Sequence, residues 1–390
     1  GYCAPAVAAG RAILFDRVGE EVRLRALALE TGAAVWEVRR GVRYVDAFGY
    51  DGGPRAQPVV AGDRVLAYGP DGRLECRRLA DGELVWGVDT SADYHVVQNF
   101  FGVGTAPIVV EAGGRPCVVV QVGGSPPDSR PPSPERLDMV RGVDSGLVAF
   151  DLADGHEVWR SSDQLASYSV PVLADVGGRR RILAWMRDDL LAVDPADGRV
   201  LDRFRWRAAE LFSVVAASPV VVGNRVLLSE CYGPGSVMLE LADDRFREVR
   251  RDRAGARPRQ ALKAHWNTPV FHDGHVYASS GRNAGDAQLV CVDWESGAVR
   301  WSEGGLGRAS VTFVDGHLVV LGEYGDLVLA RATAERYEEV SRARPIDPDD
   351  PRGRRALLAP PCWAAPVVAR GLLLVRGEGR VACLELLPER

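Results

Sequence analysis

Six side chains suited to holding a flat or sugar-like ligand recur at one spacing along the chain. Each stands three residues before the residue that opens a new segment of alternating apolar pattern. Four are aromatic and two are arginines: Tyr2, Arg55, Tyr168, Trp266, Arg308 and Trp363. Aromatic faces stack on planar groups, and a guanidinium binds an anionic or hydroxyl-bearing group. Asn99, Lys263 and His265 lie nearby in sequence and could add polar contacts.

The same spacing recurs at Gly104 and Ala216, which makes eight equivalent positions. If the position enters the innermost strand of a repeat, the eight residues surround the mouth of a central channel. They would then either form a ligand site or plug the channel by packing on one another, and both alternatives stay open. Replacing Trp266 by alanine separates them, because a ligand site would lose binding and a plug would lose stability.

No catalytic or metal-binding motif accompanies these residues. The chain has no HExxH, GxSxG, P-loop or GxGxxG pattern, so hydrolase, kinase and dinucleotide-binding functions have no motif support. His272 and His275 flank a tight turn, and we expect them at the surface rather than on a metal. Asp188, Glu230 and Glu323 are single carboxylates that we expect to be solvated. We therefore predict neither a metal nor a cofactor.

The elements that position these residues are short strands in an internal repeat. One copy runs from Ala56 to Val88 and another from Asn267 to Glu303, each with four alternating segments separated by turn residues. Four such segments predict one antiparallel four-stranded sheet. A single sheet of this kind cannot bury both its faces, and radial stacking of copies solves the problem as a β-propeller.

Eight openings predict eight blades and almost no helix. They stand at Pro5, Pro58, Pro107, Pro171, Pro219, Pro269, Val311 and Pro366. The blades should start near residues 4, 56, 105, 169, 217, 267, 309 and 364, within one domain spanning 1–390. A Pro-rich insertion at 123–145 falls in blade three and is either a mobile flap or a tolerated surface insertion. The long connections should gather on one face, which makes that face the functional candidate.

The turn that ends each copy carries a recognisable signature. It reads ETGAAVW, ADGELVW, ADGHEVW and ESGAVRW, ending at Trp36, Trp86, Trp159 and Trp301. We expect each indole to dock one blade on the next. The longer strings DLADGHEVW and DWESGAVRW resemble the tryptophan-docking motif of PQQ-like (quinoprotein alcohol dehydrogenase-like) propellers. The resemblance covers essentially the whole chain. It is closest to uncharacterised exported bacterial members, and the superfamily also contains the propeller lipoprotein of outer-membrane assembly.

The resemblance implies the fold more directly than an activity, because this superfamily contains both enzymes and scaffolds. One hypothesis is a non-catalytic protein that binds a partner protein or glycan through its loop-rich face. The alternative is a quinoprotein-type dehydrogenase using PQQ and calcium at the channel mouth, although the adjacent cysteine pair typical of those enzymes is missing. An unknown activity on carbohydrate is the third possibility.

Composition restricts partners and location. The net charge of −5 and pI near 5.8 give no basic footprint for nucleic acid, and no apolar run approaches a membrane span. We expect a monomer. Cys76, Cys291 and Cys383 share one repeat position, where we expect small buried hydrophobic side chains. After three strand segments of blade eight the sequence leaves no residues for its outermost strand. We therefore expect this blade to be three-stranded and completed by an upstream strand, itself preceded by an export signal. The expected location is periplasmic or otherwise exported.

Overall fold

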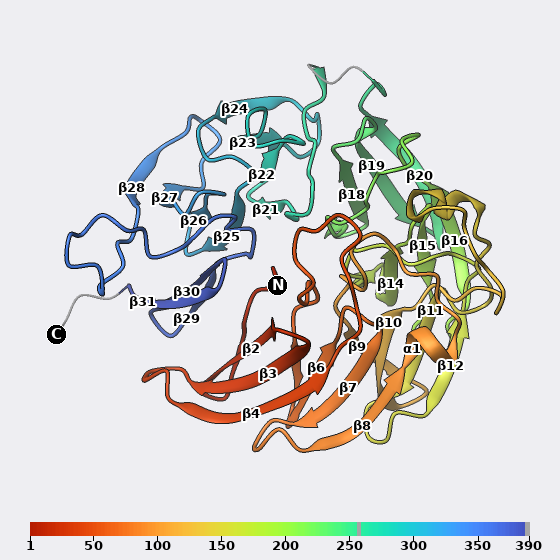
Figure 1. The fold of residues 1–390 in the computed structure, drawn as a ribbon. Helices are drawn as coiled ribbons and strands as arrows, with labels where there is room; N and C mark the ends of the chain where they lie inside the picture. Colours follow the sequence, from red (N-terminus) through yellow and green to blue (C-terminus); the bar gives the residue numbers. More distant parts are fainter. Residues whose placement is uncertain (256–258, 387–390) are drawn as a thin grey trace. The chain divides into compact units, whose positions relative to one another are not determined.

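The computed structural model describes residues 1–255 and 259–386. These residues form eight antiparallel sheets, in each of which strands that follow one another in sequence also pair (Figure 1). The fold class is therefore the eight-bladed β-propeller of four-stranded sheets, as the repeat predicts. In the described residues α-helix is limited to α1 (Thr90–Asp93), and no helix there is long and apolar enough to cross a membrane. The insertion holds a short 3-10 helix, η1 (Pro134–Met139).

The chain divides into two compact units. Unit 1 comprises residues 1, 3–227 and 238–250, and unit 2 comprises residues 2, 228–237 and 251–390. The prediction of one domain over 1–390 stays a prediction.

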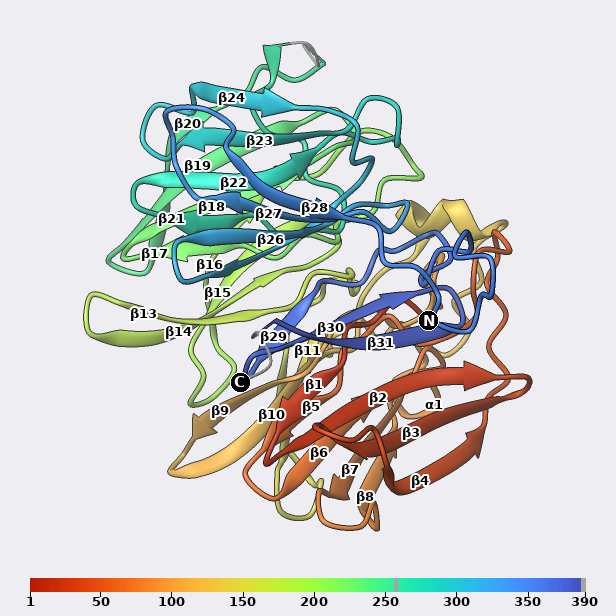
Figure 2. The same cartoon turned by 90° about the vertical axis from the view of Figure 1, so that its left-hand side faces the viewer.

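Unit 1 contains the first four sheets, whose strands lie side by side in Figures 1 and 2. The first sheet is β1 (Ala6–Ala8), β2 (Arg11–Val18), β3 (Glu21–Ala28) and β4 (Ala34–Gly41). The second is β5 (Val59–Ala61), β6 (Arg64–Tyr68), β7 (Arg73–Arg78) and β8 (Leu84–Asp89). The third is β9 (Ile108–Ala112), β10 (Arg115–Gln121), β11 (Leu147–Asp151) and β12 (Glu157–Ser161). The fourth is β13 (Val172–Val176), β14 (Arg179–Trp185), β15 (Asp189–Val193) and β16 (Val200–Arg205).

The remaining sheets follow the same order. The fifth is β17 (Val220–Val222), β18 (Arg225–Glu230), β19 (Gly235–Ala242) and β20 (Arg245–Arg251). The sixth is β21 (Val270–His272), β22 (His275–Ser280), β23 (Gln288–Asp293) and β24 (Val299–Glu303). The seventh is β25 (Ser310–Val314), β26 (His317–Leu321), β27 (Leu327–Arg331) and β28 (Glu339–Ala343). The eighth is β29 (Val367–Ala369), β30 (Leu372–Gly377) and β31 (Arg380–Glu385).

The eighth sheet has three strands in the described part of the chain, as predicted. The predicted absence of a fourth strand after β31 concerns residues 387–390, which lie outside the described residues.

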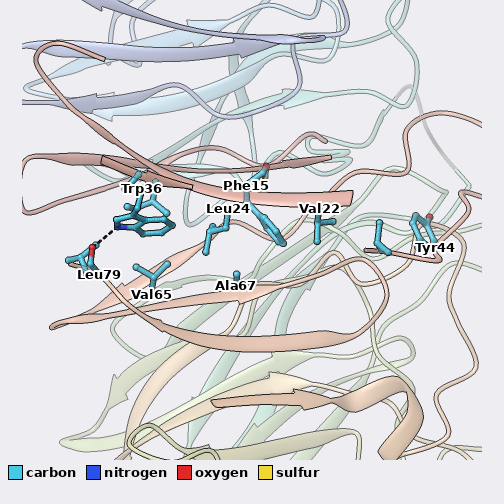
Figure 3. Packing of buried hydrophobic residues seen from close by; sticks show 12 residues of the cluster. Phe15, Val22, Leu24, Trp36, Tyr44, Val65, Ala67 and Leu79 are labelled. Carbon is cyan, nitrogen blue, oxygen red and sulfur yellow. Dashed lines mark hydrogen bonds between the residues drawn. The ribbon is translucent and has the colours of Figure 1, made fainter. Parts of the chain in front are cut away.

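Within each unit, neighbouring sheets pack on each other through buried apolar side chains. Between the first two sheets, Phe15 and Leu24 contact Val65 and Ala67, and all four are buried (Figure 3). Trp36 extends this core, and its Nε1 donates a hydrogen bond to the Leu79 carbonyl of the second sheet at 2.9 Å. The indole thus buries a large ring and satisfies its one donor.

The same contact recurs at the other signature tryptophans. Trp86 donates to the Leu152 carbonyl, Trp159 to the Pro195 carbonyl and Trp301 to the Thr333 carbonyl, at 2.8–3.1 Å. In the fourth sheet the equivalent residue is Asp202, whose carboxylate accepts from the Phe246 backbone N–H at 2.7 Å. A polar contact therefore replaces the ring where the signature is lost.

Small residues stand directly opposite these tryptophans. Trp86 pairs with Cys76 and Trp301 with Cys291, and both cysteines are fully buried. They act as small apolar side chains, as predicted. Cys383 departs from that prediction, because it is exposed on β31, an edge strand of the three-stranded sheet.

Candidate functional site

The eight equivalent positions fall into two groups, one in each unit. Unit 1 holds Arg55, Gly104, Tyr168 and Ala216, and unit 2 holds Tyr2, Trp266, Arg308 and Trp363. Within each unit the structure brings most of these residues together. The two groups are therefore described separately, and the single ring of eight residues stays a prediction.

In unit 1, Arg55 and Tyr168 converge on Phe101, a residue that the repeat alignment does not identify. The Arg55 guanidinium lies 4.9 Å from the centre of the Phe101 ring and donates to the Phe101 carbonyl at 3.2 Å. The Tyr168 hydroxyl accepts from the Phe101 N–H at 2.8 Å, and burial raises the pKa of this phenol well above its usual value. Both predicted residues therefore hold the backbone of a loop residue.

Gly104 is glycine for a steric reason. A Cβ at this position would lie 2.6 Å from the Tyr168 ring and 3.5 Å from the Arg55 Cβ. The three equivalent positions are thus packed against one another. Ala216 is half-buried, and its small side chain offers no polar group.

Asn99 stabilises the same loop. Its Oδ1 accepts from the Phe100 N–H at 2.9 Å, and its Nδ2 donates to the Ala166 carbonyl at 3.4 Å. It also lines a pocket with Gln121 and with Leu137 of the insertion. Leu137 is buried, so the insertion is anchored at η1.

Loop residues beside Arg55 and Tyr168 form an aromatic patch, which we define as Phe48, Tyr50, Phe100, Phe101 and Phe212. Phe100 is buried and Phe101 half-buried, whereas the other three rings are exposed. Their rings lie 5.6–6.4 Å apart, centre to centre, in six pairs. Phe48, Tyr50 and Phe212 are 44%, 62% and 50% exposed. The patch comes from three connections, β4–β5, β8–β9 and β16–β17, and sequence reasoning missed it.

Asp46 orders the first of these connections. Its carboxylate accepts from the Phe48 N–H at 2.8 Å and from Arg55 Nη2 at 2.8 Å. The Asp46 side chain is only 3% exposed, so the ion pair is a buried one. Buried polar contacts therefore fix the loop, while Phe48 and Tyr50 point their apolar surface outward.

In unit 2, Trp266, Arg308 and Trp363 form a compact cluster. The Trp266 and Trp363 rings lie 4.6 Å apart, and Tyr2 lies 4.8 Å from Trp363. The Arg308 guanidinium lies 5.0 Å from the Trp266 ring centre and 4.9 Å from that of Trp363. Cation–π contacts of this kind stabilise a packed cluster.

Glu323 completes the cluster and corrects one prediction. It is 4% exposed rather than solvated, because Arg308 forms an ion pair with it and Trp363 Nε1 donates to it at 3.1 Å. Burial alone would raise the pKa of this carboxyl, but the hydrogen bonds from Arg308 and Trp363 outweigh burial and hold it below the ordinary value. Glu230 is also buried, contrary to the expectation of a solvated carboxylate.

The remaining unit 2 candidates lie beside this cluster. His265 contacts Trp266 at 4.4 Å between ring centres, and its Nε2 lies 2.9 Å from the Tyr232 hydroxyl. Burial, then the charges of Arg308 and Arg282, lower the pKa of His265 to about 3, so the imidazole is neutral at neutral pH. Lys263 is placed by its backbone N–H, which donates to Ser280 Oγ at 3.0 Å.

These contacts favour the packing alternative for unit 2, because Arg308 already has a buried carboxylate partner. Ligand binding by the predicted residues stays a prediction.

We expect Glu323→Gln to lower the free energy of unfolding by about 3 kcal/mol, since it leaves Arg308 without a charge partner in a largely buried site. The control Asp326→Asn, which removes a partner of exposed Arg344, should cost less than about 1 kcal/mol. The pKa of Glu323 is lowered by folding, so its stabilisation exists above the unfolded-state pKa and disappears as the pH falls. Urea unfolding of the wild type and of Glu323→Gln, at pH 7 and at pH 3, measures the loss of stability at each pH. Equal losses at both pH values would contradict the assignment.

A carboxylate–histidine group on the β11–β12 turn also stands out. Ligand atoms of Asp151, Asp154 and His156 lie within 4.8 Å of one another. They are engaged in the turn itself: Asp151 accepts from the Ala153 N–H, and Asp154 accepts from the His156 N–H. We assign no metal to them.

Comparison with known proteins supports the class that these observations define, an eight-bladed propeller with elaborated loops. The family model described as outer membrane protein assembly factor BamB matches residues 20–303. The chain belongs to this family. No curated protein sequence matches it significantly.

Solved structures agree in fold at low identity. BamB from Moraxella catarrhalis is 14% identical with a TM-score of 0.62, over 98% of this chain and 92% of that one. Quinohemoprotein alcohol dehydrogenase from Comamonas testosteroni is 12% identical with a TM-score of 0.62, over 98% and 69%. The computationally designed Ika8 protein is 11% identical with a TM-score of 0.59, over 98% and 95%. An assembly factor, an enzyme and a designed protein thus share the architecture.

Proposed function

We propose that the protein is a non-catalytic binding protein that recognises a partner polypeptide through the aromatic patch of unit 1. The observation that carries the proposal is the exposure of Phe48, Tyr50 and Phe212 on loops that the buried Asp46–Arg55 ion pair holds in place. Soluble proteins rarely leave several large rings together in water unless another surface covers them. Aromatic anchors dominate the binding energy of protein interfaces.

The patch suits a polypeptide better than a glycan. Apart from Phe212, which stacks on buried Phe100, its rings meet edge to face or tilted rather than presenting one flat platform. Exposed Val45 and Leu211 come from the same connections as Phe48 and Phe212. Aliphatic neighbours match apolar side chains, whereas a sugar needs hydroxyl partners beside the ring. Asp46, the buried carboxylate below, is already paired with Arg55.

The patch is also ordered before binding. Asp46, Arg55 and Tyr168 fix the backbone of the loops that present it. Pre-ordered loops lose little entropy on association, which raises affinity for a given buried area.

A PQQ site does not fit the residues predicted for it. A quinone sandwiched between two rings needs about 7 Å between them, twice the contact distance of stacked carbon atoms. Trp266 and Trp363 are 4.6 Å apart, and Arg308 is already paired with Glu323. We therefore derive no redox step, and we expect no alcohol or aldose oxidation when PQQ and calcium are added.

The family description, outer membrane protein assembly factor, agrees with a protein partner. We propose accordingly that the protein acts in an exported compartment such as the periplasm, and that it does so as a monomer.

Site-specific photocrosslinking tests the proposal. A benzoylphenylalanine placed at position 48 or 212 should crosslink in source cells to one and the same polypeptide, because both rings line one surface. The same residue at Val340, exposed to a similar 48% on the outer strand β28, should not. A product of twice the chain mass would show a second copy instead, and crosslinking from Val340 alone would contradict the proposal.

A further inference from the structure

Arg187 is a buried arginine in the β14–β15 turn. The residue is 5% exposed, and among the described residues its Nη2 has no hydrogen-bond partner. A guanidinium has five N–H donors, and a buried one is normally surrounded by carboxylates or carbonyls. The missing acceptor therefore requires an explanation.

Two further arginines, Arg205 and Arg207, lie close to Arg187. Arg207 Nη1 donates to the Arg187 carbonyl at 2.9 Å, which sets a second positive group against the turn. Arg187, Arg205 and Arg207 all share the carboxylate of Asp188, at 3.4–3.5 Å between nitrogen and oxygen. Arg205 also pairs with Asp189, so Asp188 is the carboxylate that Arg187 and Arg207 share.

The other nearby carboxylates form no hydrogen bond with Arg187 that fills its open Nη2 donor, and each has partners of its own. Asp138, on η1, is held by Arg136 through two hydrogen bonds of 2.9 and 3.0 Å. Asp189 accepts from Gln164 Nε2 at 3.1 Å and pairs with Arg205 at 3.4 Å. Burial, then the charge of Arg207, lower the pKa of Arg187 to about 10, so its environment disfavours the positive charge. The buried positive charge of Arg187 is therefore undercompensated by its surroundings.

We propose that this cluster is a binding site for a small oxyanion, a carboxylate or phosphate group held between Arg187 and Arg207. Planar guanidinium groups bind such anions through paired hydrogen bonds, and the free Nη2 supplies a donor. The site reaches the surface at Asp188 and Arg205, whose side chains are 28% and 68% exposed.

The oxyanion could be a free anion or an acidic side chain of a bound polypeptide. Arg207 and Phe212 lie on the same β16–β17 connection, so an acidic residue next to an apolar anchor would use both. The oxyanion site itself rests on Arg187 and does not depend on the aromatic patch.

Thermal unfolding in inorganic phosphate, N-acetylaspartate amide and sodium chloride, at equal ionic strength, tests the site. We expect the wild-type midpoint to rise saturably by roughly 3 °C or more in phosphate or the aspartate amide, relative to chloride. A larger shift with the aspartate amide would assign the site to an acidic side chain, and a larger shift with phosphate would assign it to a phosphate-type anion.

Arg187→Met should lose the shift, whereas the control Arg203→Gln should keep it. Arg203 lies on β16, the strand of Arg205, and carries the same charge as Arg187, but it pairs with Asp163 and Asp189. In chloride, Arg187→Met should unfold at the wild-type temperature or above, because an apolar side chain replaces an undercompensated buried charge.

A structural role for Arg187 predicts the opposite, a midpoint several degrees lower in Arg187→Met. That result, or an equal phosphate shift in the variant, would overturn the proposal. If Arg187→Met does not fold, calorimetric titration of the wild-type protein with phosphate decides, and the absence of saturable binding would overturn it. Serine at Phe48 and Phe212 should leave the phosphate shift intact, so failure of the two proposals is distinguishable.

Discussion

Gly155→Ala is expected to destabilise the protein by roughly 2–4 kcal/mol, far more than a turn glycine usually contributes. Gly155 has φ +78°, so any Cβ there costs about 1 kcal/mol of backbone strain. That Cβ would also lie 2.6 Å from the Trp86 indole, which docks the second sheet on the third. Overpacking of this kind costs a further 1–3 kcal/mol, roughly.

Gly114→Ala is the matched control in the same sheet. Gly114 has the same φ of +78°, and a Cβ there would meet nothing within 4 Å. It should therefore cost only the backbone strain, and the difference between the variants in urea unfolding isolates the contact with Trp86. Equal losses of stability in the two variants would mean that a Cβ at residue 155 does not disturb the packing of the Trp86 indole.

The repeat could be predicted from the sequence because the residues that define it lie close together along the chain. Each first strand begins one to three residues after a predicted blade start, for example Val59 after 56 and Ile108 after 105. The tryptophan, the glycine of the turn that precedes it and the small residue opposite its ring all lie within one copy. Where the signature degrades, Asp202 shows that a different interaction takes over, which no pattern predicts.

The candidate sites were only half predictable. The repeat alignment identifies equivalent positions that converge from copies two apart: Arg55 and Tyr168 both contact Phe101, and Trp266 contacts Trp363. Their partners Asp46 and Glu323 come from turns and connections of unequal length, where no register applies. Glu323 and Arg187 are buried by tertiary packing. An isolated charged residue in a sequence looks like a surface residue, so the sequence does not predict this burial.

Serine at both Phe48 and Phe212 is expected to weaken partner binding at least ~100-fold. Each ring is about half exposed in the free protein, and truncation of an aromatic anchor at an interface costs roughly 2 kcal/mol or more. Two rings together therefore exceed the 2.7 kcal/mol or so that a 100-fold change requires. Because the rings are exposed, the thermal midpoint should hardly change.

The dissociation constant of the crosslinked polypeptide, measured with wild-type protein and with this double variant, tests the central claim most directly. The control is a double variant with serine at Val299 and Val340, which are 47% and 48% exposed on outer strands of unit 2. The account predicts at least a ~100-fold rise for the patch variant and less than ~2-fold for the control. Unchanged affinity of the patch variant, with its fold intact, would contradict the account.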